Sequence, residues 1–268
     1  MKKVLLTLFA VFVVTVPTMG ATTYNPANRV QEVGEKLLTK NNIPASNVKF
    51  MVVSGIPDNS DFVTNKVINI SSSELAFAGN DNEVASVIAT EIGHLVCGHA
   101  SKSKVISLLQ SASNTEIATN ETLQTFASNY KTTKQDKEAD LVAVNLMVNA
   151  EYNPLALIVV LTKQTGTYWD AIIGRPANAD KALNVYDYIS YAFPSKLKVG
   201  YNCNEYRTFL AYADTIIAER KDNKKSASKY EKTYKKAQKK VSTDLVKFRT
   251  RGGLSGWDAV YGLLNTAN

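Results

Sequence analysis

The chain has 268 residues, a hydrophobic content of 45% and a formal net charge of +7, which support a real core in one large or two modest domains. Two cysteines, Cys97 and Cys203, exclude a disulfide scaffold. A single bridge between them and a buried free thiol at Cys97 both remain compatible with the sequence. The excess charge is concentrated between residues 219 and 251, where 13 Lys and Arg accompany 4 Asp and Glu.

The N-terminus has the pattern of an export signal. Lys2 and Lys3 precede a mostly apolar run at positions 4–16, and Gly20 or Ala21 offers a small residue for cleavage. This run is shorter than the roughly 20 apolar residues that span a bilayer, which favours a signal peptide over residues 1–21. We therefore expect an exported protein, periplasmic or secreted, with an uncleaved membrane anchor as the alternative.

The first elements in chain order are a helix, two strands and a second helix. Apolar positions at helical spacing predict a helix over Asn25–Lys40. Val48–Val53 and Phe62–Ser71 read as strands, separated by a turn at Gly55–Ser60. A polar stretch with several capping candidates then precedes an apolar helix at about Glu83–Gly98.

The remainder of the chain is mostly helical in pattern. Ser111–Thr133 is rich in Ser, Thr and Asn and predicts a loop or a mobile lid. Helices are predicted at Ser101–Leu109, Lys134–Ala150, Leu155–Gln164, Ala177–Phe193 and Glu205–Thr243, with a turn at Gly174–Pro176 and a loop at Pro194–Asn204. Two strands among many helices indicate an α+β, mainly helical domain over residues 22–200, followed by a basic helical region over 201–268.

The most informative motif is Thr90-Glu91-Ile92-Gly93-His94, in the predicted helix Glu83–Gly98. It matches the zinc-protease motif H-E-x-x-H with threonine in place of the first histidine. In the intact motif, two histidines one turn apart bind zinc, and the glutamate acts as general base. Here the base and the second imidazole remain, and His99 is the only other histidine in the chain.

Other residues follow this motif in a recognisable order. Gly98-His99 comes directly after it, Glu138-Ala139-Asp140 lies on the next strong helix, and Tyr152-Asn153-Pro154 follows. This order resembles the gluzincin-type zinc metallopeptidases, among them HtpX, the CAAX prenyl endopeptidase, the Oma-type proteases and BepA. In that family, the third zinc ligand is a glutamate in an E-x-x-x-D or E-A-D pattern on a later helix.

The resemblance implies a role for each matching residue. It makes His94 and Glu138 zinc ligands and Glu91 the general base that activates the metal-bound water. Asp140 would not bind the metal itself but would orient a ligand or a neighbouring side chain. Arg175, in a turn where the family often has His-Pro, would stabilise an oxyanion, and Lys181 matches a basic residue that follows.

The same resemblance implies a place for the substrate. The strand near residues 67–70 would pair with an extended peptide substrate, by strand addition.

Thr90 puts the zinc centre in question, because a neutral hydroxyl is a poor zinc ligand. On a continuous helix, the His99 ring would point about 140° away from that of His94, so His99 would approach only if the helix ended before it. Cys97 shares the face of His94 and is the better substitute on helix geometry, although it lies on the opposite side from Thr90.

Two functions therefore follow from the resemblance. One is an exported zinc metalloendopeptidase. The other is a pseudo-enzyme that binds peptides or unfolded envelope proteins without cutting them. The basic region is either a solvated helix or a surface for an anionic envelope partner, and no nucleic-acid partner is expected.

Overall fold

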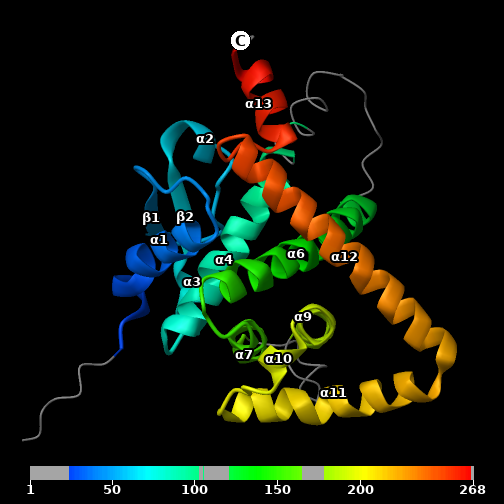
Figure 1. Cartoon of the computed structure of the whole chain (residues 1–268). Helices are drawn as coiled ribbons and strands as arrows, with labels where there is room; N and C mark the ends of the chain where they lie inside the picture. Colours follow the sequence, from blue (N-terminus) through cyan, green and yellow to red (C-terminus); the bar gives the residue numbers. More distant parts are fainter. Residues whose placement is uncertain (1–23, 103–104, 106–120, 165–177, 267–268) are drawn as a thin grey trace, which may run out of the picture.

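The computed structural model describes residues 24–102, 105, 121–164 and 178–266 (Figure 1). The helices are η1 (Pro26–Arg29), α1 (Val30–Lys40), α2 (Phe62–Asn65), α3 (Ser72–Leu75), α4 (Asp81–Cys97), α6 (Glu121–Asn149), α7 (Leu155–Lys163), α9 (Ala179–Ala192), α10 (Pro194–Leu197), α11 (Asn204–Asp222), α12 (Lys224–Thr250) and α13 (Gly256–Thr266). The strands are β1 (Lys49–Val53) and β2 (Val67–Ser71). This arrangement confirms the prediction of a mainly helical α+β fold with a small sheet.

Helices α4 and α6 cross at the centre of the molecule (Figure 1). Their close approach depends on Gly93, since a Cβ atom there would overlap the backbone carbonyl of Ala139 on α6. On both helices, residues such as Ile88, Ile92 and Leu146 are fully buried. A glycine in mid-helix costs about 1 kcal/mol of helix propensity, so its place here reflects the packing of two backbones.

Strands β1 and β2 form a two-stranded parallel sheet, with Lys49 opposite Val67 and Val53 opposite Ser71. The strand predicted from residue 62 begins only at Val67, because Phe62–Asn65 forms the short helix α2. Lys66 ends α2 in the left-handed conformation, and its C=O accepts from Lys49 N–H. The reversal at Lys66 thus sets the start of the sheet.

Three sequence-based predictions of irregular or continuous structure are wrong. The predicted loop Pro194–Asn204 contains the short helix α10 (Pro194–Leu197). The described part of the predicted loop Ser111–Thr133 is helical from Glu121, where α6 begins. The predicted continuous helix Glu205–Thr243 is two helices separated at Asn223. The Asn223 side chain accepts from the N–H groups of Lys225 and Ser226, so it caps α12 and lets the chain turn.

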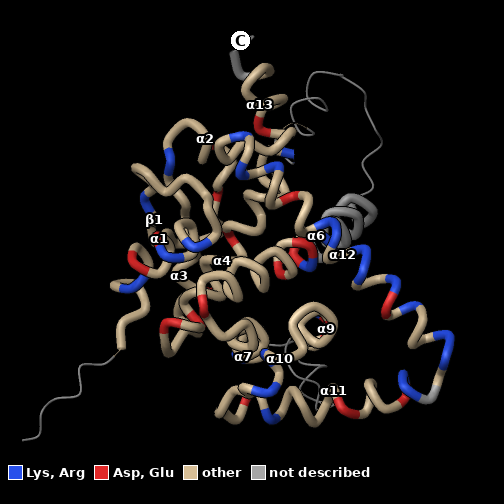
Figure 2. The backbone as a smooth tube through the Cα atoms, in the orientation of Figure 1, with Lys and Arg blue, Asp and Glu red and all other residues tan. Residues whose placement is uncertain are grey.

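Helices α11 and α12 run along two sides of the molecule and meet at an acute corner (Figure 1). Lys and Arg are spaced along the outer side of α12 (Figure 2). Its inner side contributes Tyr234, Val241, Leu245 and Phe248 to the same buried core as the α4–α6 pair. The basic region is therefore anchored by an apolar stripe of its own.

None of the helices in the described ranges is long and apolar enough to cross a membrane. The expected signal peptide, residues 1–21, lies outside these ranges and stays a prediction.

Candidate functional site

Helix α4 presents the motif residues to a cleft beside the sheet. Asn80 caps its first turn, accepting from the N–H groups of Asn82 and Glu83. The cleft has a volume of about 380 Å³. Its walls come from the loop after β1, from α3, from α4 and the residues just beyond it, and from α6: Ile56, Pro57, Asn59, Glu74, Glu91, His94, Leu95, His99, Ala100, Gln135 and Asp136.

The α6 carboxylate that faces His94 in this cleft is Asp136. Its Oδ1 lies 3.7 Å from His94 Nε2, whereas Glu138 Oε2 lies 3.6 Å from His99 Nε2. The sequence analysis did not single out Asp136. This residue occupies the glutamate position of the E-x-x-x-D pattern of the family, four residues before Asp140. Residues 136 and 140 are four apart and share a helix face, whereas Glu138 lies two positions from each and faces elsewhere.

Glu91, the expected general base, is held by a single amide. Asn59 Nδ2 donates to Glu91 Oε2 at 2.9 Å. Burial, with the nearby carboxylate of Glu74, raises the pKa of Glu91 to about 8, against the smaller opposing effect of the Asn59 hydrogen bond. Glu91 is therefore largely protonated at neutral pH, and a protonated carboxyl does not act as a base.

Thr90 and Asp140 form a buried polar pair behind the cleft. Asp140 is completely buried, and desolvation raises its pKa to about 6 despite the opposing charge of Lys181. Within the described residues, neither the Thr90 Oγ1 nor either carboxylate oxygen of Asp140 has a partner with hydrogen-bond geometry. A buried carboxyl without a well-formed hydrogen bond is costly, and the nearby Thr90 hydroxyl and Lys181 ammonium offset only part of the desolvation of Asp140.

Lys181 supplies the positive charge at this end of the cleft. Its Nζ lies 3.4 Å from Asp136 Oδ2 and 3.9 Å from Asp140 Oδ2. Burial works against its charge, but the two aspartates outweigh that effect and leave the Lys181 pKa above its usual value. The ammonium group thus partly neutralises the two aspartates from α6.

His94 and His99 are direct neighbours, contrary to the geometry of a continuous helix. Helix α4 ends at Cys97, and Gly98 follows with φ of +65°, in the left-handed region. This reversal brings His99 Nδ1 to 3.0 Å from His94 Nδ1. Burial and the neighbouring ring of His99 lower the His94 pKa to about 4, so His94 is neutral at physiological pH.

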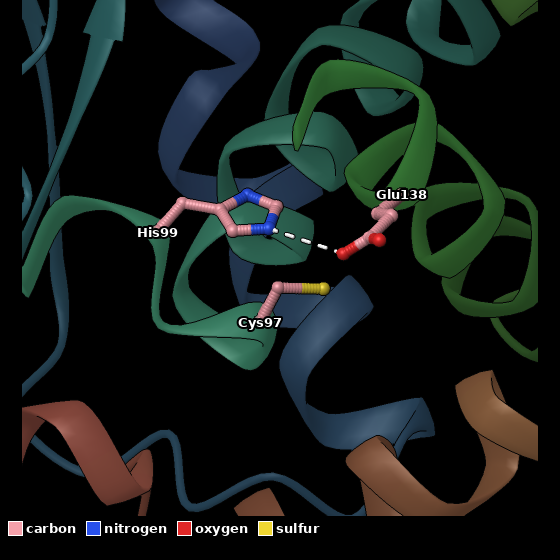
Figure 3. A group of neighbouring side chains, drawn as sticks. All are labelled: Cys97, His99 and Glu138. Atoms are coloured by element: carbon pink, nitrogen blue, oxygen red, sulfur yellow. Dashed lines mark ion pairs between the residues drawn. The ribbon is translucent and has the colours of Figure 1, made fainter. Parts of the chain in front are cut away.

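Cys97 and Glu138 lie beside His99 (Figure 3). Hydrogen bonding to His99 is the largest effect on Glu138, and with the Lys240 charge it outweighs desolvation and lowers the Glu138 pKa to about 2. Burial raises the pKa of the Cys97 thiol to about 12. Cys97 and Cys203 are both free thiols, so the bridge that the sequence allowed is not formed.

The cleft residues do not complete the zinc centre that the resemblance implies. A catalytic zinc in proteins has three protein ligands and one open position. His94 Nε2 and Asp136 Oδ1 are suitable donors in the cleft, but the position of the first histidine of the motif holds the neutral hydroxyl of Thr90, which is a poor zinc ligand. Arg175, the expected oxyanion group, lies outside the described residues.

The edge of β2 that faces this cleft is occupied by a side chain. Asn59 Oδ1 accepts from the Asn69 N–H at 2.7 Å, and Asn59 Nδ2 donates to the Asn69 carbonyl at 3.2 Å. Asn69 Nδ2 in turn donates to the Asp58 carbonyl at 2.7 Å. The side-chain amide of Asn59 therefore takes the two backbone positions with which a neighbouring strand would pair.

Comparison with known families gives one result that covers most of the described domain. The model of peptidase family M48 matches residues 25–198, which is more than half of the chain. No curated protein and no solved structure matches the chain. Peptidases of this family depend on zinc, so the match supports a function of the zinc-metallopeptidase type. Together with the motif on α4 and the acidic residues on α6, it shows that the chain belongs to peptidase family M48.

Proposed function

We propose that this protein is a peptide-binding member of its family that no longer hydrolyses what it binds. The ligand is an extended segment of peptide or unfolded protein, which would displace the Asn59 side chain and add as a strand to that edge of β2. The predicted signal peptide makes this an exported protein that meets its ligands in the cell envelope or outside the cell.

The observation that carries the proposal is the position of Asn59. Its carboxamide has the same donor and acceptor as a peptide group, and it bonds both the N–H and the C=O of Asn69. Its Nδ2 also reaches Glu91. A peptide that replaced this amide would keep both bonds to β2 and would lie directly over the old catalytic glutamate.

Three features argue against hydrolysis in this cleft. Thr90 removes the first zinc ligand, and burial raises the pKa of Glu91 and so favours its protonated form in the metal-free protein. Lys181 places an ammonium group 3.4 Å from Asp136, which disfavours a second cation beside the same carboxylate.

A true metalloendopeptidase is the second candidate. It is favoured by the convergence of Glu91, His94 and Asp136 on one cleft, since these three groups are the base and two ligands of a complete centre. The two candidates differ in the fate of a bound peptide, and one experiment separates them.

The experiment measures binding and integrity of the same peptide. A fluorescent unstructured peptide is titrated with the mature protein, and mass spectrometry follows its length in the presence of Zn²⁺. Peptides that are N-methylated at alternate residues provide the test of strand addition. We expect binding to be lost when one alternate set is methylated and kept with the other set, because only one side of a strand faces β2.

Asn59→Ala is the matched variant for this assay. Because it removes the side chain that competes for Asn69, we expect about fivefold tighter peptide binding, the equivalent of roughly one hydrogen bond. An intact peptide throughout supports the binding function, whereas Zn²⁺-dependent cleavage would establish the endopeptidase. Equal loss of binding with both methylated sets, or none with either, would rule out pairing with β2.

A further inference from the structure

A second group of metal-binding side chains lies at the C-terminal end of α4. The ligand atoms of Cys97, His99 and Glu138 all lie within 4.8 Å of one another. Figure 3 shows the three side chains pointing toward a common centre, Cys97 from the last residue of α4, His99 from just beyond it and Glu138 from α6. This group uses neither Thr90, His94 nor Asp136 as a ligand, so its ligand set differs from that of the incomplete centre, although His99 also lines the cleft.

We propose that Cys97, His99 and Glu138 form a zinc site of their own. Thiolate, imidazole and carboxylate are the three donor types that zinc accepts in proteins. Zinc–ligand distances of about 2.0–2.3 Å place the corners of a tetrahedron roughly 3.3–3.7 Å apart. The separation of 3.6 Å between His99 Nε2 and Glu138 Oε2 is already one such edge.

The local sequence explains why these donors meet. Gly98 has φ of +65°, and a Cβ atom there would overlap the side chain of Ser255. Only glycine fits both conditions, and the reversal that it permits directs His99 back beside Cys97. The spacing Cys-Gly-His is therefore a short turn that presents two donors on one side, as ligand pairs in zinc sites commonly do.

The histidine pair provides the outer partner that a zinc-bound imidazole requires. A metal on His99 Nε2 fixes the proton of that ring on Nδ1. His94 Nδ1 lies 3.0 Å away, within hydrogen-bond reach of that proton. The ring of His94 would then carry its own proton on Nε2, toward Asp136 at 3.7 Å.

One cation, the ammonium group of Lys240, already lies near the three side chains. Lys240 Nζ lies 3.5 Å from Glu138 Oε2 and 2.9 Å from Asp244 Oδ2. Its side chain is 51% exposed, so it can release Glu138 and keep Asp244 when a metal arrives. A cavity of about 280 Å³ is lined in part by Cys97 and Lys240, so the Cys97 side of the group borders an open space.

Binding of Co²⁺ in place of Zn²⁺ tests this site without an activity assay. A cobalt–thiolate bond has a charge-transfer absorption that a site of histidine and carboxylates lacks. We expect the full-length mature protein to take up one Co²⁺ with this absorption, and Zn²⁺ to displace it. Cys97→Ser should abolish the absorption and weaken binding by more than tenfold, while Cys203→Ser, which changes the other free thiol, should leave both unchanged.

The two α6 carboxylates give the second matched pair. Glu138→Gln should weaken Co²⁺ binding by more than tenfold, and Asp136→Asn should leave the absorption intact. The reverse result, binding that survives Cys97→Ser and is lost in Asp136→Asn, would place the metal in the cleft and overturn the proposal. Failure of the wild type to bind Co²⁺ or Zn²⁺ would overturn it as well.

Alkylation of the thiol guards against variants that fail to fold. In the Cys203→Ser background, zinc should slow the alkylation of Cys97 at least tenfold, and a chelator should restore the rate. An equal rate with and without zinc would contradict the site, whatever the fate of the substitutions.

Discussion

The two ends of helix α4 differ in how complete a set of zinc ligands they offer. On the cleft side, Glu91 and His94 face Asp136, but the first ligand position is a threonine. At the C-terminal end, Cys97 and His99 meet Glu138, and all three are chemically suited to zinc. The crossing of α4 and α6 therefore carries an incomplete ligand set in the cleft and a neighbouring group of three side chains that zinc accepts.

The contrast extends to the carboxylates. Burial raises the pKa of Glu91 to about 8, whereas the His99 hydrogen bond and the Lys240 charge lower that of Glu138 to about 2. Two acids on crossing helices thus differ in charge at neutral pH. Their partners account for the difference, because Glu91 has one neutral amide donor and Glu138 has a histidine and a lysine.

The largest expected structural effect comes from a substitution that separates α4 from α6 and so disrupts both the cleft and the Cys97–His99–Glu138 group. Gly93→Ala should destabilise the protein by about 3 kcal/mol, because the new Cβ would force the α4 and α6 backbones apart. Urea unfolding measures the change. The control is Gly262→Ala in α13, where no atom lies within 4 Å of the added Cβ and where helix propensity predicts a gain of up to about 1 kcal/mol. Equal stability of the two variants would mean that α4 and α6 are not in close contact.

Restoring the missing ligand should make the cleft resemble a complete centre. We expect Thr90→His to bind a Zn²⁺ ion in the cleft roughly 100-fold more tightly than the wild type, because it adds an imidazole donor and gives Asp140 a partner. Isothermal titration in the Cys97→Ser background isolates this site. If Thr90→His does not raise the Zn²⁺ affinity in that background, the missing histidine is not what prevents zinc binding, and Lys181 or Glu91 prevents it instead.

The two glutamates should affect the pH dependence of stability in opposite directions. A raised pKa in the folded state means that Glu91 holds a proton that the unfolded chain has lost, so stability falls as pH rises from about 4.5 to about 8. Glu91→Gln should remove a loss of order 5 kcal/mol across that window.

Glu138 provides the opposite sign in the same measurement. Its lowered pKa contributes stability that is present above about 4.5 and is lost as pH falls toward about 2. Its side chain is 34% exposed, so the effect of Glu138→Gln should stay below about 1 kcal/mol after solvent screening. Urea unfolding from pH 3 to 9 in the presence of a chelator records both slopes, and parallel curves for the two variants would refute the assignment.

The smallest expected effect is on binding to anionic membranes through the exposed lysines of α12. If this helix docks on an anionic envelope surface, Lys232→Ala should weaken binding to anionic vesicles roughly fivefold, and added salt should weaken it further. Lys198→Ala, an exposed lysine outside α12, is the control. Both substitutions leave the buried stripe of α12 intact, whereas truncation before this helix would remove core residues such as Phe248. Equal binding of both variants would identify α12 as a solvated basic helix.

The sequence alone determined the features that depend on local hydrogen bonding and on periodic apolar residues. These are the mainly helical fold, the helix that carries Glu91 and His94, and the missing ligand at Thr90. The left-handed Gly98 is local as well, but helix geometry alone did not reveal how far it turns His99 toward His94.

Only the tertiary structure decided which side chains converge. The choice between Asp136 and Glu138 depends on the rotation of α6 against α4, which the contact at Gly93 fixes. The amide of Asn59 on β2, and the burial of one side of α12, likewise join residues far apart in the chain. Such contacts form because packed backbones and buried polar groups must all be satisfied together, a condition that no single stretch of sequence expresses.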